Sequence, residues 1–228
     1  MLVHGFAVSS RYMLPTAERL SGRYPVLAPD LPGYGQSQEP GQVLDVPELA
    51  EFLAGWLARR GITRVVLVGN SFGCQIIADL ALRYPERVSH VVMIGPTADA
   101  DARTMLQHIW RLARDLLHEP FALWLIQGHD YLAFCLRWQW KTARYMLDDR
   151  IEQKLPLLRM PILVLRGEHD PIAPQRWVER LARLAPAGSV AIVPDAGHAV
   201  NYSAPAALVA EIERFLSAWP DEETGQDG

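Results

Sequence analysis

One serine in this sequence stands in the local setting of a catalytic nucleophile. Ser71 is the centre of Gly69-Asn70-Ser71-Phe72-Gly73, which lies between the apolar run Val65–Val68 and the helical segment Cys74–Leu82. A G-x-S-x-G pentapeptide between a strand and a helix is typical of a turn so sharp that only small flanking residues fit around the serine. Such a turn presents the hydroxyl above the carboxyl edge of a parallel sheet, where ligands bind. We interpret Ser71 as a nucleophile; the alternative is a serine that only caps a helix.

A histidine and an aspartate that could activate this serine follow later in the chain. A serine hydroxyl is a poor nucleophile at neutral pH unless a base lies within hydrogen-bond reach. His198 follows the last predicted strand on a glycine-containing loop, and Asp170 ends the strand before it. Asp170 would fix the tautomer of His198 and stabilise its imidazolium. The alternatives are a turn-capping Asp170, a surface-loop His198, or an acid placed instead at Asp99 or Asp101.

An oxyanion hole needs two hydrogen-bond donors aimed at the oxygen that becomes negative. The backbone N–H of Phe72, directly after the nucleophile, is one candidate. The loop His4-Gly5-Phe6 follows the first predicted strand and offers the N–H of Phe6 as the second. Gly5 lets this backbone approach a substrate closely, and we expect His4 to fix the loop by hydrogen bonds rather than to transfer protons.

The elements that must position these residues alternate between strands and helices. Such alternation predicts an α/β fold, with a mostly parallel sheet and helices on both faces. The predicted strands are near-continuous runs of apolar residues, as expected for strands covered on both sides. They are Leu2–His4, Pro25–Asp30, Arg64–Gly69, Val88–Ile94, Pro161–Arg166 and Val190–Val193.

Local signals also predict three helices. Asp45 and Glu48 have the spacing of a capping box at the start of one helix, which Gly61 ends. A second helix is expected from about Phe72 to Arg83 and a last one from near Ser203–Pro205, with Ser203 as its N-cap.

Residues 96–156 break the alternation, because they show helical spacing and many aromatic residues but no strand signal. We expect them to form a helical layer inserted into a core made of residues 1–95 and 157–220. Most of its aromatic residues should pack together, and one or two should line a substrate pocket, for which Trp124, Trp138 and Trp140 are the candidates. Residues 221–228 are expected to be a disordered acidic tail.

Five motifs together resemble those of the α/β-hydrolase superfamily. They are His4-Gly5-Phe6, Asp30-Leu-Pro-Gly-Tyr-Gly-Gln-Ser37, the Ser71 pentapeptide, Gly-Glu-His-Asp170-Pro-Ile and Ala-Gly-His198. The chain order serine, aspartate, histidine is the order known for that fold. The resemblance implies an α/β-hydrolase fold in which residues 96–156 form a helical cap over the active site. The pentapeptide itself resembles those of carbon–carbon bond hydrolases of aromatic degradation and of small carboxylesterases.

The sequence also departs from its relatives in places. They usually carry two further strands before the one leading to His4, so Pro25–Asp30 would become a sheet edge, which leaves a homodimer open. Ala199 follows His198 where the carbon–carbon hydrolases often have tryptophan, which favours the esterases.

Composition excludes several other classes of protein. The 228 residues carry a net charge of −4, without the basic stripe that nucleic acid binding requires. No segment is long and apolar enough to span a bilayer and no signal peptide is evident, so we expect a cytoplasmic protein with no membrane partner. Cys74 and Cys135 are the only cysteines and read as buried small apolar residues. His169 beside Glu168 and Asp170 could suggest a metal, but neighbouring strand residues point to opposite faces, so we expect none.

These observations predict a cofactor-independent serine hydrolase that cleaves esters of small or medium carboxylic acids. Dehalogenase and epoxide-hydrolase chemistry is disfavoured, because by the resemblance those relatives place aspartate at the nucleophile position. A carbon–carbon hydrolase of ring-fission products is the rival enzyme, and a ligand receptor on the same fold is the rival without catalysis.

Overall fold

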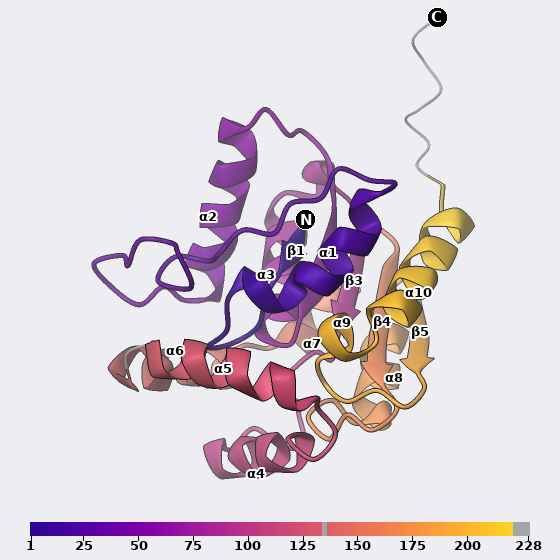
Figure 1. The fold of residues 1–228 in the computed structure, drawn as a ribbon. Helices are drawn as coiled ribbons and strands as arrows, with labels where there is room; N and C mark the ends of the chain where they lie inside the picture. Colours follow the sequence, from indigo (N-terminus) through magenta and orange to yellow (C-terminus); the bar gives the residue numbers. More distant parts are fainter. Residues whose placement is uncertain (134–135, 221–228) are drawn as a thin grey trace, which may run out of the picture.

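The computed structural model describes residues 1–133 and 136–220, and its centre is a parallel sheet (Figure 1). The strands are β1 (Leu2–Val3), β2 (Val65–Asn70), β3 (Val88–Ile94), β4 (Ile162–Gly167) and β5 (Gly188–Val193), and they lie side by side in chain order. Every neighbouring pair is parallel. The predicted fold class, a parallel sheet with helices, is therefore confirmed.

Helices cover both faces of the sheet. Alternate residues of β3 point to opposite sides, so Met93 packs with α2 (Val46–Arg59), α3 (Phe72–Arg83) and α8 (Gln175–Leu184). Val92 packs on the other side, with α1 (Leu14–Ser21) and α10 (Pro205–Ala218). All seven residues of β3 are buried, as expected for a strand between two layers of helices.

The local signals for α2 and α3 are borne out. The Asp45 carboxylate accepts the Glu48 N–H at 2.9 Å, and the Glu48 carboxylate accepts the Asp45 N–H at 2.8 Å. Gly61 follows α2 with a φ of +68°, which a residue without a side chain adopts readily. Helix α3 has the predicted bounds.

Two predicted features are wrong. Pro25–Asp30 is not a strand and is not part of the sheet. Its contact with β1 is the Leu27 carbonyl, which accepts the Leu2 N–H at 2.7 Å. Pro25 and Pro29 have no N–H to donate, and β1 beside them is only two residues long.

Ser203 is also not the N-cap of the last helix. It ends the short helix α9 (Val200–Ser203), and Ala204 precedes α10. The Ser203 hydroxyl instead donates to the Ala199 carbonyl at 3.0 Å, four residues back, which occupies the group a cap would use.

The segment between β3 and β4 contains the helices α4 (Met105–Asp115), α5 (Phe121–Ala133), α6 (Leu136–Asp148) and α7 (Ile151–Lys154). In Figure 1, α4, α5 and α6 gather at the end of the sheet to which the strand arrows point. Its described residues include no strand. Short 3₁₀ turns lie at Ser10–Met13, Pro85–Arg87 and Leu155–Leu157. Cys135 and the predicted tail 221–228 lie outside the described residues.

Candidate active site

Ser71 occupies a strained turn between β2 and α3. Its φ of 58° and ψ of −121° are unusual for a residue with a side chain and cost on the order of 1–3 kcal/mol. The flanking glycines make the turn possible: a Cβ on Gly73 would lie 2.4 Å from the Val3 carbonyl oxygen, and one on Gly69 would lie 2.7 Å from the Gly73 backbone. The Ser71 N–H donates to the Ile94 carbonyl at 2.8 Å, which ties the turn to the end of β3.

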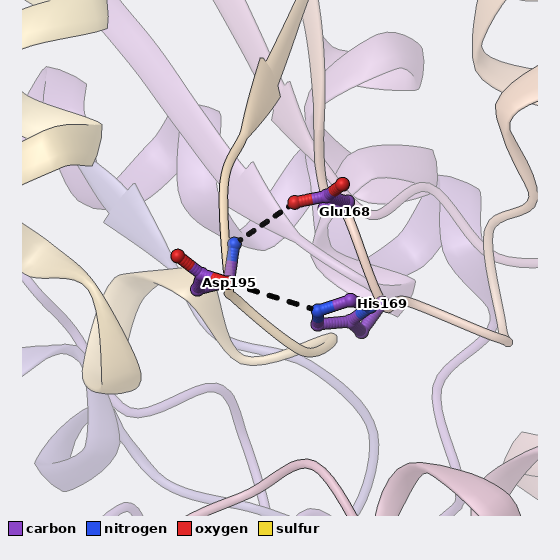
Figure 2. Close-up of side chains that lie close together, drawn as sticks. All are labelled: Glu168, His169 and Asp195. Carbon is purple, nitrogen blue, oxygen red and sulfur yellow. Dashed lines mark hydrogen bonds and ion pairs between the residues drawn. The ribbon is translucent and has the colours of Figure 1, made fainter.

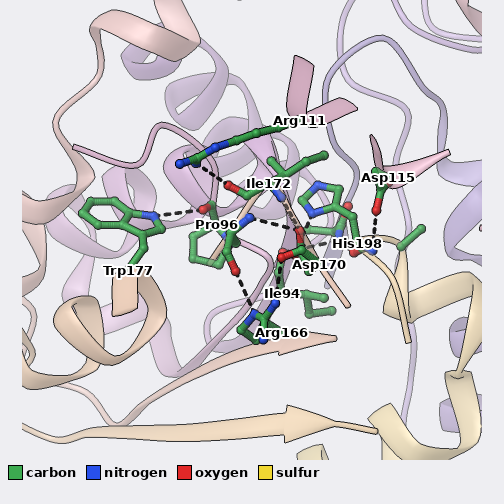
Figure 3. A network of polar contacts seen from close by, with 12 residues as sticks. Ile94, Pro96, Arg111, Asp115, Arg166, Asp170, Ile172, Trp177 and His198 are labelled. Carbon is green, nitrogen blue, oxygen red and sulfur yellow. Dashed lines mark hydrogen bonds and ion pairs between the residues drawn. The ribbon is translucent and has the colours of Figure 1, made fainter. Parts of the chain in front are cut away.

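Asp170 and His198 are brought together at the ends of β4 and β5 (Figure 3). The Nδ1 atom of His198 lies 2.9 Å from Oδ2 of Asp170. The other carboxylate oxygen accepts the N–H groups of Ile172 and Ala173 at 2.8 and 3.0 Å. Asp170 therefore caps a turn and orients the histidine at once, so the two interpretations of this residue do not compete.

Gly95 makes room for this pair. It follows β3 with a φ of +54°, and a Cβ there would lie 2.8 Å from His198 Nδ1 and 2.9 Å from Asp170 Oδ2. Any larger residue would both strain the backbone and push the imidazole away from its carboxylate.

The second ring nitrogen of His198 is available for chemistry. Nε2 is buried and has no hydrogen-bond partner among the described residues. His198 and Ser71 both line the same cavity. Burial of the ring opposes the imidazolium, but the carboxylates of Asp170, Asp115 and Glu119 outweigh it and raise the pKa of His198 to about 9.

Two further carboxylates hold the backbone around His198. Asp115, the last residue of α4, accepts the His198 N–H at 3.0 Å. Glu119 accepts the Ala199 N–H at 2.6 Å, and its other oxygen, Oε2, is buried without a partner among the described residues. Burial raises the pKa of Asp115, and burial together with the nearby Asp115 raises the pKa of Glu119 to about 7.

The candidate oxyanion donors flank Ser71. Phe72 is the first residue of α3, and Phe6 lines the cavity with Gly5 and Ser71. Gly5 approaches the serine closely, since a Cβ there would lie 3.0 Å from the Ser71 Cβ. The roles of the Phe6 and Phe72 amides remain predictions.

A polar network fixes the loop that carries Phe6. The Tyr12 hydroxyl accepts the Gly5 N–H at 3.0 Å and donates to the Asn70 side-chain oxygen. The Asn70 amide in turn donates to the carbonyls of Ile94 and His198, each at 3.3 Å. The loop, the serine turn and the histidine loop are thus linked through the side chains of Tyr12 and Asn70, for which no signal in the sequence predicts this role.

His4 and Asp30 also hold the backbone near the Phe6 loop through hydrogen bonds. Nε2 of His4 accepts the Leu31 N–H at 3.0 Å, so the proton must be on Nδ1, which donates to the Gly5 carbonyl at 2.9 Å. Burial lowers the pKa of His4, which favours this neutral tautomer. Asp30 accepts the N–H groups of Ser10 and Gln36. These contacts accord with a positioning role for His4.

The cavity above Ser71 has a volume of about 450 Å³ and lies between the sheet and the helices α4 and α5. Besides Ser71, His198, Asn70, Tyr12 and Tyr131, its polar side chains are Asp115, His108 and Gln127, and no lysine or arginine is among the described residues that line it. Burial lowers the pKa of His108 to about 4, so this ring is neutral near pH 7.

The three tryptophans predicted at a pocket fall in different places. Trp124 lines the cavity. Trp138 packs against Gly33, where an added Cβ would lie 3.1 Å from its ring, and Trp140 is 59% exposed. The expectation for Trp138 and Trp140 is thereby corrected, because the first packs on the Gly33 turn, the second is exposed, and neither lines the cavity.

The alternative acids for the histidine are occupied elsewhere. The buried Asp99 pairs with Arg111 at 2.8 Å and with Arg176 at 3.0 Å. Asp101 is exposed and lies 3.8 Å from Arg176. Neither lines the cavity that contains His198.

A separate polar cluster lies at the surface (Figure 2). The Asp195 N–H donates to Glu168 Oε2 at 3.2 Å, and His169 Nε2 lies 4.0 Å from Asp195 Oδ1. Potential ligand atoms of these three exposed residues lie within 4.8 Å of one another. Asp195 comes from the loop after β5, so alternation along the strand of Glu168 and His169 does not apply to it.

Comparison with known proteins identifies the family. A model described as the alpha/beta hydrolase family matches residues 1–212, and this chain belongs to that family. A curated relative, 2-(acetamidomethylene)succinate hydrolase of Mesorhizobium japonicum, is 25% identical over 244 residues, covering 96% of this chain and 87% of that protein.

Solved structures share the fold over nearly the whole chain. A thermophilic esterase from Thermogutta terrifontis has a TM-score of 0.82 at 24% identity and covers 96% of this chain and 89% of its own. A meta-cleavage product hydrolase from Pseudomonas fluorescens has a TM-score of 0.77 at 21% identity and covers 95% of this chain and 89% of its own.

Among the described residues, no helix is long and apolar enough to cross a bilayer.

Proposed function

We propose that this chain is a serine hydrolase that cleaves uncharged esters of small and medium carboxylic acids through an acyl-enzyme. The observation that carries the proposal is the buried, unpartnered Nε2 of His198, a residue that lines the same cavity as Ser71 and whose Nδ1 is held by Asp170. A ring held in this way can accept a proton at Nε2 and at no other atom.

The reaction then has two halves. Ser71 Oγ attacks the ester carbonyl carbon as its proton passes to His198 Nε2, and the oxyanion is stabilised by the Phe6 and Phe72 amides. Collapse of this intermediate breaks the bond to the alcohol oxygen, which takes the proton from Nε2 and leaves. Water next attacks the acyl-enzyme with His198 again as the base, which releases the acid and restores the serine hydroxyl.

The charge of the cavity favours esters over the rival carbon–carbon hydrolase reaction. The ring-fission products are dienoates and carry a carboxylate that needs a positively charged or strongly donating partner. The described lining residues offer no lysine or arginine and include the carboxyl of Asp115, and their cation near pH 7, His198, is already paired with Asp170. Burying a substrate carboxylate there would be unfavourable, whereas an uncharged acyl chain fits the apolar lining.

Turnover measurements test the proposal. Neutral aryl esters of increasing acyl length should be hydrolysed in many turnovers by the wild type, and Ser71→Ala should reduce kcat by about 10³ or more. A dienoate ring-fission product should be cleaved much more slowly than the best ester. Faster cleavage of the dienoate would establish the carbon–carbon hydrolase instead. Binding of esters with a single slow turnover would establish a receptor.

A further inference from the structure

Exposed apolar side chains are concentrated on one part of this molecule. Of the thirteen large hydrophobic side chains exposed in the described part of the chain, nine lie between Leu106 and Trp140. Six of them do not line the cavity, and we call these the cap face: Leu106, Trp110, Leu117, Phe121, Leu125 and Trp140. So many large exposed apolar side chains within 35 residues are unusual on a protein without a partner for them.

Helix α4 is amphipathic in the reverse of the usual sense. A surface helix normally turns its apolar stripe inward and its polar residues to water. In α4 the buried residues are His108 and Asp115, while Leu106 and Trp110, four residues apart on one side of the helix, are 77% and 66% exposed. Leu117 extends this side beyond the end of the helix and is 80% exposed. The side of α4 that lines the cavity carries His108 and Asp115 together with Leu112, so Leu106 and Trp110 are left exposed outside the cavity.

Charge is segregated in the same region. Between residues 102 and 147 the only acidic residues are Asp115, Glu119 and Asp130, and the structure turns all three inward. The cations Arg114, Lys141 and Arg144 are exposed. Exposed Asp101 and Asp148 stand just outside the two ends of this stretch, and between them the outer surface carries exposed cations but no exposed acid, although the whole chain has a net charge of −4.

The cap face is continuous with the mouth of the cavity. Ile109, Leu116 and Trp124 are all exposed and also line the cavity above Ser71. A molecule lying on the cap face would therefore be adjacent to the entrance of the candidate active site.

We propose that the cap face binds the surface of an anionic lipid bilayer. Tryptophan and leucine side chains enter the boundary between headgroups and acyl chains, while nearby arginine and lysine residues are attracted to anionic headgroups. A second copy of the chain fits less well, because the exposed charged residues between positions 102 and 147 are all positive and offer a like face no opposite charge. The sequence expectation of no membrane partner rests on the absence of a spanning segment, and binding at the surface needs none.

Vesicle flotation of the full-length protein tests the proposal. The probes are vesicles of phosphatidylcholine alone and vesicles with about 30% phosphatidylglycerol. The wild type should bind the anionic vesicles at least about tenfold more strongly, and added salt should weaken this binding. Ser71→Ala should bind equally, because the proposal does not depend on catalysis.

The variant that tests the apolar side chains is Leu106→Ser with Trp110→Ser and Leu117→Ser. It should lose about tenfold or more in binding while a soluble short-chain ester is turned over as by the wild type. The matched control is Leu157→Ser with Val190→Ser, which removes exposed apolar residues outside the cap face and should bind normally. Should the triple variant not fold, Arg114→Glu with Lys141→Glu should abolish the preference for anionic vesicles.

Three results would overturn the proposal. The first is no binding of wild-type protein to either kind of vesicle. The second is an equal loss of binding in the triple variant and its control. The third is a dimer, measured by light scattering, that the triple variant loses while vesicles remain unbound, which would assign the cap face to a second copy.

Discussion

Glu119→Gln should make the stability of this protein less dependent on pH. Glu119 is buried beside the histidine loop, where Oε1 accepts the Ala199 N–H and Oε2 has no partner among the described residues. Burial and the neighbouring Asp115 raise the pKa of Glu119 from 4.5 to about 7. A glutamine keeps the accepting oxygen, never ionises, and places an amide where the unpartnered oxygen lies.

The direction and the size of this pH effect on folding stability follow from the difference between the folded and unfolded pKa values of Glu119. Between pH 4.5 and 7 the folded protein retains a proton on Glu119 that the unfolded chain has lost, so folding stability falls as the pH rises through this window. The two pKa values correspond to about 3 kcal/mol once both states are ionised. Of this, about 2.5 kcal/mol should develop between pH 5 and pH 8.

Urea unfolding at about pH 5 and pH 8 measures the effect. The free energy of unfolding of Glu119→Gln minus that of the wild type should be about 2.5 kcal/mol larger at pH 8 than at pH 5. Glu86→Gln is the control, because that side chain is 67% exposed. The difference in unfolding free energy between this variant and the wild type should be the same at both pH values. A difference that changes by less than about 0.5 kcal/mol would refute the account of a buried carboxyl that resists ionisation.

Three further predictions concern the reaction. Asp170→Asn should lower kcat by about 10⁴, whereas Asp101→Asn should have little effect. A large loss of kcat in Asp99→Asn or Asp101→Asn instead would show that one of those residues, and not Asp170, orients His198. The value of kcat/KM should rise with pH as the His198 imidazolium, with its pKa of about 9, loses its proton, and a flat profile would contradict its role as base. Trp124→Ala should change the preference between short and long esters more than about twofold, while Trp138→Ala and Trp140→Ala should not; three unchanged ratios would make the aromatic layer structural.

Much of the fold could be predicted because its signals are local. Helix α3 begins after the serine turn and ends at Tyr84-Pro85, both of which are visible in the sequence, and its predicted bounds agree with the structure. The strand at Pro25–Asp30 could not be judged in the same way. Its composition suits a strand, but pairing depends on the length of its neighbour β1 and on the N–H groups that its two prolines lack.

In the candidate site, too, residues with local sequence signals could be predicted, and residues placed by long-range packing could not. Ser71, Asp170 and His198 each follow a strand within a short motif, so sequence alone could nominate them. Asp115 and Glu119 lie 83 and 80 residues from the backbone amides they accept, and only the folding of the helical segment brings them there. An acidic residue within an apolar helical stretch was the one available signal, and it does not reveal the partner.

The most direct test of the proposed function is covalent labelling of the nucleophile. A fluorophosphonate should add one label per molecule, and mass spectrometry of the peptides should place it on Ser71. Ser71→Ala should remain unlabelled, and Asp170→Asn should be labelled far more slowly, because His198 then loses the group that orients it. Labelling at another residue, or a Ser71→Ala protein that is labelled at the wild-type rate, would contradict the assignment of Ser71 as the nucleophile of this hydrolase.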